Sequence, residues 1–313
     1  MKFTVLIPTH DHGAVISMAI GSVREQTHED WELFVVADGA PPEAFAEIER
    51  AVQNDPRIRV FRFPKGERHG EAWRHEALQQ ATGEAVCYLS DDDFWFPDHL
   101  EHMRPMLERA DFAHTRQTIV WPSYEVSGPL NDIADASTRE RMLHSKFNYF
   151  GPSVSGHRLD TYRRLPQGWT PAPADLWSDL HMWRKWITAE GMRFQSSFAV
   201  TTVHLPRSLR PGLDQRDALL ENVFWREAFR DTDMRQALRD VMMGGDEKFS
   251  LSLVLVRAHA LRTEREAKAN AALATMRKTQ DGLGNELRAM QNTATWRYTK
   301  PLRELWARVR RRG

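Results

Sequence analysis

Apolar and polar positions alternate in a regular way along the first 110 residues. Short apolar runs predict four strands: 3–7, 31–36, 58–63 and 85–89. Apolar positions at helical spacing predict four helices between and after them: 13–25, 43–52, 69–81 and 97–108. Repeated strand–helix–strand units predict an α/β fold with a doubly wound, mostly parallel sheet and flanking helices. Ligands of such sheets bind at the carboxyl ends of the strands.

The pattern is less regular beyond residue 112. Further strands are expected within 112–126 and 194–205. Helices are expected at 179–188 and within 214–242. The helical pattern then breaks at Gly244-Gly245. We therefore expect one domain over residues 1–245, followed by a part of a different kind.

Residues 246–313 are predicted to form a helical extension. Ala, Leu, Arg and Glu are abundant in 252–272, and apolar residues then recur every seven positions: Met276, Leu283 and Met290. This repeat favours a helix that pairs with a second copy in a homo-oligomer. The register is short, however, and it is interrupted by two glycines: Gly282 and Gly284.

The last segment, 296–312, interleaves basic residues with aromatic and aliphatic ones and contains one acid, Glu304. A basic, aromatic-bearing helix suits an anionic membrane surface. One prediction is therefore peripheral membrane binding through this segment. The alternative is a solvated helix end or a disordered basic tail.

Composition excludes several classes of protein. The chain of 313 residues has Lys+Arg 43 and Asp+Glu 43, so no overall charge favours nucleic acid as a partner. Its single cysteine, Cys87, excludes an intramolecular disulfide and fits a reducing compartment. No stretch approaches the roughly 18–20 apolar residues of a membrane span. We expect a cytoplasmic protein that is soluble, or peripheral on the inner face of the membrane.

Three consecutive aspartates, Asp91, Asp92 and Asp93, directly follow the apolar run at 85–90. A buried strand is not expected to end in three negative charges without a compensating partner. Hard divalent cations prefer oxygen ligands, so the cluster predicts a metal site and a phosphorylated ligand. The alternative is a helix N-cap, because aspartate is favoured there and Pro97 suits the start of a helix.

Two other predicted strands also end in polar residues. Thr9-His10-Asp11 follows the first strand, and Asp38 follows the second. Because such strand ends lie side by side in a parallel sheet, these side chains should converge on one crevice, where they suit ribose hydroxyls or a base edge. The chain has no Gly-x-Gly-x-x-Gly after the first strand and no Walker-type Gly-Lys-Ser/Thr. This argues against nicotinamide cofactors and P-loop chemistry.

In their order and spacing, these segments resemble family-2 glycosyltransferases of the GT-A fold. The resemblance extends over residues 3–205 and is strongest up to residue 101. The segments that carry it are 5–9, 22–27, 32–39, 70–78, 83–93 and 96–100. It implies a glycosyltransferase domain at 1–245, with a nucleotide-binding half at 1–110 and an acceptor half at 111–245.

The resemblance implies transfer of a sugar from a nucleotide-diphosphate donor, with inversion at the anomeric carbon and Mg²⁺ or Mn²⁺ on the diphosphate. Asp92 matches the metal ligand, and Arg74 matches a basic position near the donor phosphates. Asp93 is a sugar-facing candidate, or lies behind the site. The remaining donor contacts implied by position are Thr9, Asp11 and Asp38 for the nucleoside and Asp91 for the ribose.

The chain departs from the family pattern at Asp11, Ala37 and Ser90, which leaves the nucleotide open, with a UDP-sugar favoured. No Gln-x-x-Arg-Trp motif of processive members is present, which favours transfer of a single sugar.

Inverting transfer needs a base that deprotonates the acceptor hydroxyl. In the family it is an acid at the start of a helix beyond the central region, which implies Asp179, with Asp175 in reserve. The alternative for Asp179 is an acid that only stabilises the helix N-terminus. His204 is either a further metal or phosphate ligand or a structural histidine.

Two arginines, Arg207 and Arg210, suit either a grip on the diphosphate or a solvated loop. Four tryptophans suit either an acceptor-stacking face or the core: Trp169, Trp177, Trp183 and Trp186. Helical spacing favours the core for at least the last two.

The leading hypothesis is an inverting, metal-dependent transferase that adds one sugar to a glycan or lipid-linked acceptor in cell-surface polysaccharide synthesis. One alternative is a nucleotidyltransferase-like enzyme, which usually carries a basic, Gly-rich loop after the first strand that is absent here. The other is a non-catalytic GT-A scaffold that docks to a membrane or a partner through its C-terminal helix.

Overall fold

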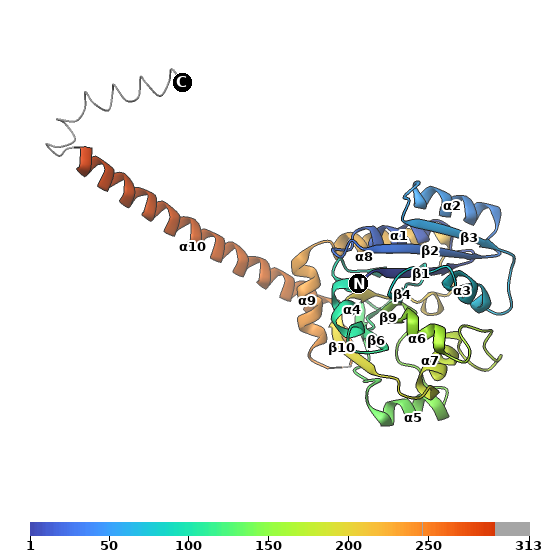
Figure 1. The fold of residues 1–313 in the computed structure, drawn as a ribbon. Coiled ribbons are helices and arrows are strands. Elements are labelled where there is room, and N and C mark those ends of the chain that lie inside the picture. The colour runs from blue at the N-terminus through green and yellow to red at the C-terminus, as the bar shows by residue number, and fades with distance from the viewer. Residues whose placement is uncertain (246, 292–313) are drawn as a thin grey trace, which may run out of the picture. The chain divides into compact units, whose positions relative to one another are not determined.

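The computed structural model describes residues 1–245 and 247–291, and a seven-stranded sheet lies at its centre (Figure 1). Four parallel neighbours come from the first part of the chain: β4 (Ala85–Tyr88), β1 (Phe3–Thr9), β2 (Trp31–Asp38) and β3 (Ile58–Phe63). Beyond β4 lie β9 (Ser155–Arg158), β6 (Phe112–Arg116) and β10 (Phe194–Val200), and β9 is antiparallel to both of its neighbours. The mostly parallel, doubly wound sheet predicted from the sequence is confirmed.

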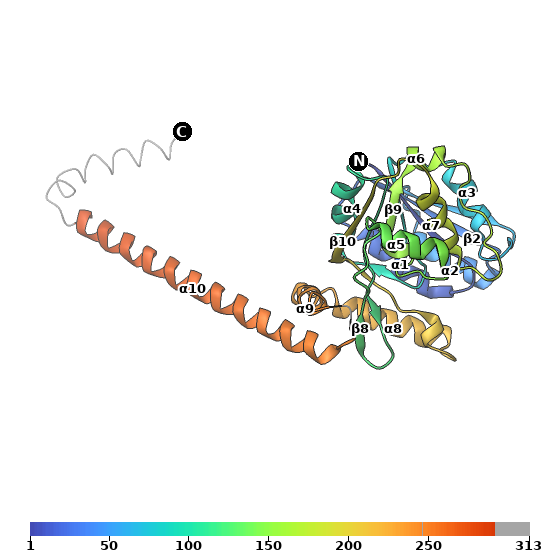
Figure 2. The same cartoon turned by 90° about the horizontal axis from the view of Figure 1, so that it is seen from below.

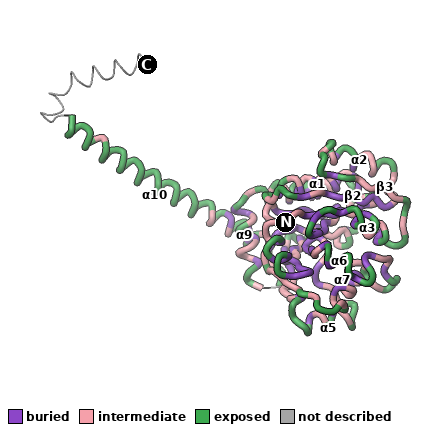
Figure 3. The backbone as a smooth tube through the Cα atoms, in the orientation of Figure 1, coloured by how far each residue is buried: buried purple, intermediate pink, exposed green. Residues whose placement is uncertain are grey.

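Side chains alternate between two cores, one on each face of the sheet. From β1, Phe3, Val5 and Ile7 enter one core and Leu6 enters the other. The first core packs against α1 (Ile16–Arg24), α2 (Pro42–Val52) and α4 (His99–Leu107). The second packs against α3 (Glu71–Leu78), α5 (Ala136–His144), α6 (Leu159–Arg164) and α7 (Ser178–Thr188). Burial on both faces explains the apolar runs of β1, β2 and β4, and Figure 3 shows that the buried residues gather at the centre of this part of the chain.

The second half of the chain adds shorter elements around this sheet. One small sheet pairs β5 (Phe94–Trp95) with β11 (Thr202–Val203), and another joins β7 (Ile119–Val120), β8 (Glu125–Ser127) and β12 (Phe249–Ser250). The remaining elements of this half are η2 (Pro152–Val154), η3 (Arg207–Leu209), α8 (Gln215–Ala228) and α9 (Thr232–Met242). The β7–β8 hairpin lies beside α8 in Figure 2. The buried Arg116 guanidinium binds the carbonyl oxygens of Gly128, Met242 and Gly245, and so ties β6 to the end of α9.

Several local expectations differ from the structure. The first strand, predicted at 3–7, continues through Pro8 to Thr9, which pairs with Ala37. The predicted helix at 13–25 is a short 3-10 turn, η1 (Gly13–Val15), followed by α1. None of the three consecutive aspartates caps a helix, since a turn and β5 follow them and α4 begins only after Asp98. The N-cap alternative for the aspartates is therefore wrong.

The C-terminal part contains one long helix, α10 (Leu251–Gln291). The chain divides into two compact units, Met1–Ala258 and His259–Gly313, so α10 begins in the first. The helix continues through Gly282 and Gly284, and apolar side chains exposed along it include Leu273, Met276, Leu283 and Leu287. The basic segment 296–312 lies outside the described residues. Within the parts that are described, no helix has the length and apolar character needed to cross a membrane.

Candidate active site

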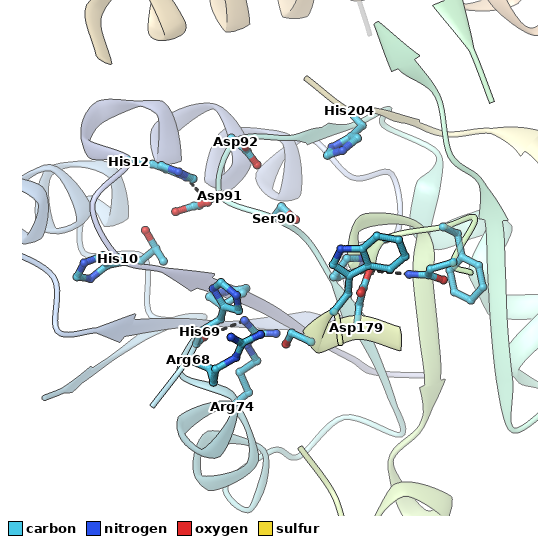
Figure 4. A pocket seen from close by; sticks show the side chains of 18 of the residues that line it. His10, His12, Arg68, His69, Arg74, Ser90, Asp91, Asp92, Asp179 and His204 are labelled. Atoms are coloured by element: carbon cyan, nitrogen blue, oxygen red, sulfur yellow. Dashed lines mark hydrogen bonds and ion pairs between the residues drawn. The ribbon is translucent and has the colours of Figure 1, made fainter. Parts of the chain in front are cut away.

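An open cavity of about 810 Å³ lies where β1, β2 and β4 end. Its lining includes residues from the segments after these strands and, across from them, residues of the second half of the chain. In Figure 4, His12, Asp91 and Asp92 lie on one side of the cavity and Asp179 lies across from them, with Arg74 below. The sequence-predicted residues that line it are Thr9, Asp11, Asp38, Arg74, Asp91, Asp92, Asp179 and His204.

Asp38, at the end of β2, is held by its neighbours in one orientation. Its carboxylate accepts a hydrogen bond from the Gly66 backbone N–H at 2.6 Å and forms an ion pair with Lys65 Nζ at 2.5 Å. Gly70 approaches so closely that an added Cβ would lie 2.6 Å from Asp38 Cγ, and its φ of +69° also favours glycine. His10 Nδ1 donates to the Asp38 carbonyl oxygen at 2.7 Å. Asp38, the candidate contact to the nucleoside, is thus held in place by the protein itself.

The three aspartates have three different environments. Asp91 Oδ1 lies 2.7 Å from His12 Nδ1, and this hydrogen bond is the main cause that raises the pKa of His12 to about 9. Asp92 is 9% exposed, and no described residue donates a hydrogen bond to it. Burial, with Asp93 and Asp91 nearby, raises the pKa of Asp92 to about 7. A buried carboxylate without a partner is costly, so this position favours a cation.

Asp93 points away from the cavity and does not line it. It is 1% exposed, and its carboxylate accepts a hydrogen bond from Ser153 Oγ at 2.5 Å. His204 Nδ1 lies 2.7 Å from Asp93 Oδ1. Burial lowers the pKa of His204, but the Asp93 carboxylate outweighs this effect and the pKa is raised. Asp93 therefore orients His204, whose ring borders the cavity.

Asp179 lies in the first turn of α7, where its carboxylate is held from two sides. Oδ1 accepts from the Leu180 backbone N–H at 2.7 Å, and Oδ2 accepts from Asn148 Nδ2 at 2.8 Å. Burial nevertheless raises the pKa of Asp179 to about 6, although these hydrogen bonds and Arg74 oppose the rise. Such a carboxylate is ionised at neutral pH and still basic enough to take a proton.

Arg74, on α3, brings a buried positive charge to the same cavity. Its guanidinium lies 4.8 Å from the centre of the Trp169 ring and donates to the His69 carbonyl oxygen at 2.9 Å. Burial lowers the pKa of Arg74, and Glu71 is the first of the acids that oppose this effect. An arginine at this place suits a phosphate.

Other sequence-predicted candidates lie elsewhere. Asp175 does not line the cavity, although Leu176 and Trp177 do. Arg210 neither faces this cavity nor is solvated, because it is buried and forms an ion pair with Glu221 at 2.6 Å. Arg207 Nη2 donates to the Leu213 carbonyl oxygen.

The tryptophans divide as the helical spacing predicted. Trp183 and Trp186 are fully buried, which confirms their place in the core, and Trp169 is buried with them. Trp177 is 48% exposed and lines the cavity.

Sequence reasoning missed three residues at this site: His12, Lys65 and Asn148. His12 lies in the polar segment after the first strand, so its chemistry was visible, but its contact with Asp91 depends on the fold. Lys65 and Asn148 reach the site from loops and belong to no motif. No signal in a single sequence identifies them.

Comparison with known proteins now gives the family. Residues 4–158 match the family model described as Glycosyl transferase family 2. The uncharacterized glycosyltransferase YwdF of Bacillus subtilis is 26% identical over 177 residues, which are 50% of this chain and 65% of that protein. A Campylobacter jejuni protein described as GalNAc(5)-diNAcBac-PP-undecaprenol beta-1,3-glucosyltransferase is 23% identical, over 66% of this chain and 68% of its own length.

A solved structure also matches the fold. S. aureus TarS 1-349 in complex with UDP-GlcNAc gives a TM-score of 0.51 at 16% identity, over 76% of this chain and 71% of that one. The chain belongs to glycosyltransferase family 2, through a domain that the family model matches from residue 4 to residue 158. The GT-A-type fold implied by the resemblance is confirmed.

Proposed function

We propose that this protein transfers a single sugar, with inversion, from a UDP-sugar to a hydroxyl of a glycan or lipid-linked acceptor in cell-surface polysaccharide synthesis. The observation that carries the proposal is the position of the half-buried Asp179 across the cavity from Asp91 and Asp92. One side of the cavity suits a nucleotide diphosphate, and the other offers a base.

The donor side would bind the nucleotide through groups that are already oriented. Thr9, Asp11 and Asp38 would contact the nucleoside, and the Arg74 guanidinium would meet the diphosphate. Asp92, with Asp91 beside it, fits Mg²⁺ or Mn²⁺, because it is a buried carboxylate to which no described residue hydrogen-bonds. When bound, the cation would neutralise the charge that develops on the leaving diphosphate.

Asp179 would act as the base. The acceptor oxygen attacks the anomeric carbon on the face opposite the diphosphate, and its proton passes to the Asp179 carboxylate. A new carbon–oxygen bond forms to the acceptor, while the bond to the phosphate oxygen breaks and its electron pair leaves with the nucleoside diphosphate. Asn148 and the Leu180 N–H hold the carboxylate for this step.

The acceptor side favours a sugar. Trp177 offers an exposed ring at the rim, and aromatic faces suit sugar rings. The C. jejuni relative, which is named for an undecaprenol-linked substrate, supports a lipid-linked acceptor. Membrane binding through 296–312 stays a prediction from the sequence. Pairing of α10 with a second copy is supported by the seven-residue spacing of its exposed Met276 and Leu283.

The alternatives explain fewer observations. A nucleotidyltransferase would need basic residues after β1, and the loop there contains Asp11, two histidines and Gly13. A non-catalytic scaffold gives no reason for a half-buried carboxylate with a raised pKa, Asp179, to line the cavity.

A thermal-shift panel of nucleoside diphosphates, each with and without Mn²⁺, tests the donor half of the proposal. A ligand that binds only the native state raises the melting temperature, so UDP with Mn²⁺ should give the largest shift. Release of UDP from UDP-sugars in the presence of lipid-linked saccharides then tests transfer. No shift with any nucleotide, at concentrations up to the millimolar range, would refute the proposal.

A further inference from the structure

Three potential metal ligands lie together at the edge of the cavity. His12, Asp91 and Asp92 each offer one ligand atom, and these atoms all lie within 4.8 Å of one another. His12 comes from the segment after β1, whereas the two aspartates follow β4. The fold, rather than local sequence, brings the three together (Figure 4).

The surroundings of Asp92 give an independent reason to place a cation at this cluster. Asp92 is nine-tenths buried, lines the cavity and accepts no hydrogen bond from any described residue. His12 Nδ1 lies 2.7 Å from Asp91 Oδ1, so a ring nitrogen stands directly beside the carboxylates.

We infer that His12 is a direct nitrogen ligand of the divalent cation, and that His12, Asp91 and Asp92 hold the cation before the nucleotide binds. The inference about cation binding rests on the proposed function in one respect only, namely that the bound cation serves sugar transfer. It assigns Asp91 to the metal rather than to the ribose. Because imidazole suits transition metals better than it suits Mg²⁺, the site should prefer Mn²⁺.

His204 is the competing nitrogen ligand. Its Nδ1 is bound to both oxygens of Asp93, at 2.7 and 2.9 Å, so only its other ring nitrogen is left for a cation. It does not belong to the group of ligand atoms that lie within 4.8 Å of one another. Among the described residues, His12 is thus the histidine with its ring nitrogen beside the paired carboxylates.

The test uses Mn²⁺ and the full chain without nucleotide. Electron paramagnetic resonance titration should give a single Mn²⁺ site, and pulsed measurements should detect one coupled histidine nitrogen, identified by ¹⁵N-histidine labelling. His12→Gln keeps a side-chain N–H that can bind Asp91 but removes the ring nitrogen. We expect it to weaken Mn²⁺ binding at least tenfold and to abolish the nitrogen coupling. If His12 only oriented Asp91, its loss would also weaken binding, by about 10–100-fold. The native protein would then show no coupling to His12, so the coupling distinguishes the two roles.

His204→Gln and His10→Gln are the matched controls and should retain the coupling. Persistence of the coupling in His12→Gln, its loss in His204→Gln instead, or no Mn²⁺ binding without nucleotide would each overturn the inference. His12→Asn provides a second variant if His12→Gln does not fold. If Mn²⁺ binds through His12 but no sugar is transferred, the proposed function fails alone. If sugar is transferred without a histidine coupling, the inference fails alone.

Discussion

The donor and acceptor sides of the cavity, here called the donor wall and the acceptor wall, are built differently. On the donor wall, the charged groups already pair with one another: His12 with Asp91 at 2.7 Å, and Lys65 with Asp38 at 2.5 Å. On the acceptor wall, Asp179 is held by one side chain, Asn148, and Trp177 is exposed. The donor wall is pre-organised for one class of ligand, whereas the acceptor wall leaves room for specificity to vary.

The difference follows from where each wall originates. The donor wall lies at the carboxyl ends of neighbouring parallel strands, β1, β2 and β4, whose positions the sheet fixes. The acceptor wall comes from loop residues near 148 and from the start of α7. Loops on a rigid scaffold are the usual carriers of specificity. Substitutions on the two walls should therefore have separable effects.

The largest effect is expected from Asp179→Asn. Removal of a general base lowers the rate of the chemical step by about 10²–10⁴-fold. Donor binding should persist, because the donor wall does not include Asp179. Single-turnover transfer and the UDP-induced thermal shift, measured on the same preparation, separate the two. A variant that transfers sugar at the native rate would show that Asp179 is not the base.

Asp38→Asn should produce the opposite pattern. It removes the charged acceptor that the proposal assigns to the nucleoside, and a hydrogen bond to a charged group contributes about 1.5–3 kcal/mol, so UDP affinity should fall about 10–100-fold. Calorimetric titration with UDP measures this. The melting temperature of the nucleotide-free variant is the control for local misfolding. Unchanged UDP affinity would show that Asp38 does not contact the nucleotide.

The pKa of Asp179 also predicts an effect of pH on the rate. With a pKa of about 6, the carboxylate is protonated below that pH and cannot accept a proton, so the rate should fall on the acid side of pH 6. A pH profile of kcat with saturating donor and Mn²⁺ measures it. The acid limb should disappear from the residual activity of Asp179→Asn.

Asp179→Asn should increase the stability of the folded protein at alkaline pH although it lowers the transfer rate. Desolvation raises the pKa of Asp179 above its ordinary value, so the carboxyl group ionises more easily in the unfolded state, and above pH 6 its charge destabilises the native state. Asp179→Asn should therefore raise the melting temperature at pH 8, by about 2–4 °C for each kcal/mol gained. The gain should vanish near pH 4, where the carboxyl group is protonated in the native state. Melting curves at both pH values test the sign, and an equal gain at both would contradict this account.

The same contrast separates what the sequence could predict from what it could not. The aspartates after β4 and Asp38 after β2 were predictable, because strand periodicity gives both the strand and its end. The partners of these residues were not: His12 meets Asp91 across 79 positions, and Asn148 meets Asp179 across 31. Asp93, identical to its neighbours in chemistry, turns into the protein because Ser153 and His204 lie there. The resemblance gave the three carboxylates different roles, but only the packed structure shows the partners of each.

The smallest effect is expected from Trp177→Ala. The ring lines the acceptor wall and is 48% exposed, so its removal costs little burial and should leave the melting temperature unchanged. If the ring stacks on the acceptor, the KM for acceptor should rise severalfold while kcat and UDP affinity stay the same, because uniform binding is lost without a change in the chemistry. Trp177→Phe should restore most of the loss, since it keeps an aromatic face. Equal acceptor KM values for all three proteins would show that the acceptor does not stack on Trp177.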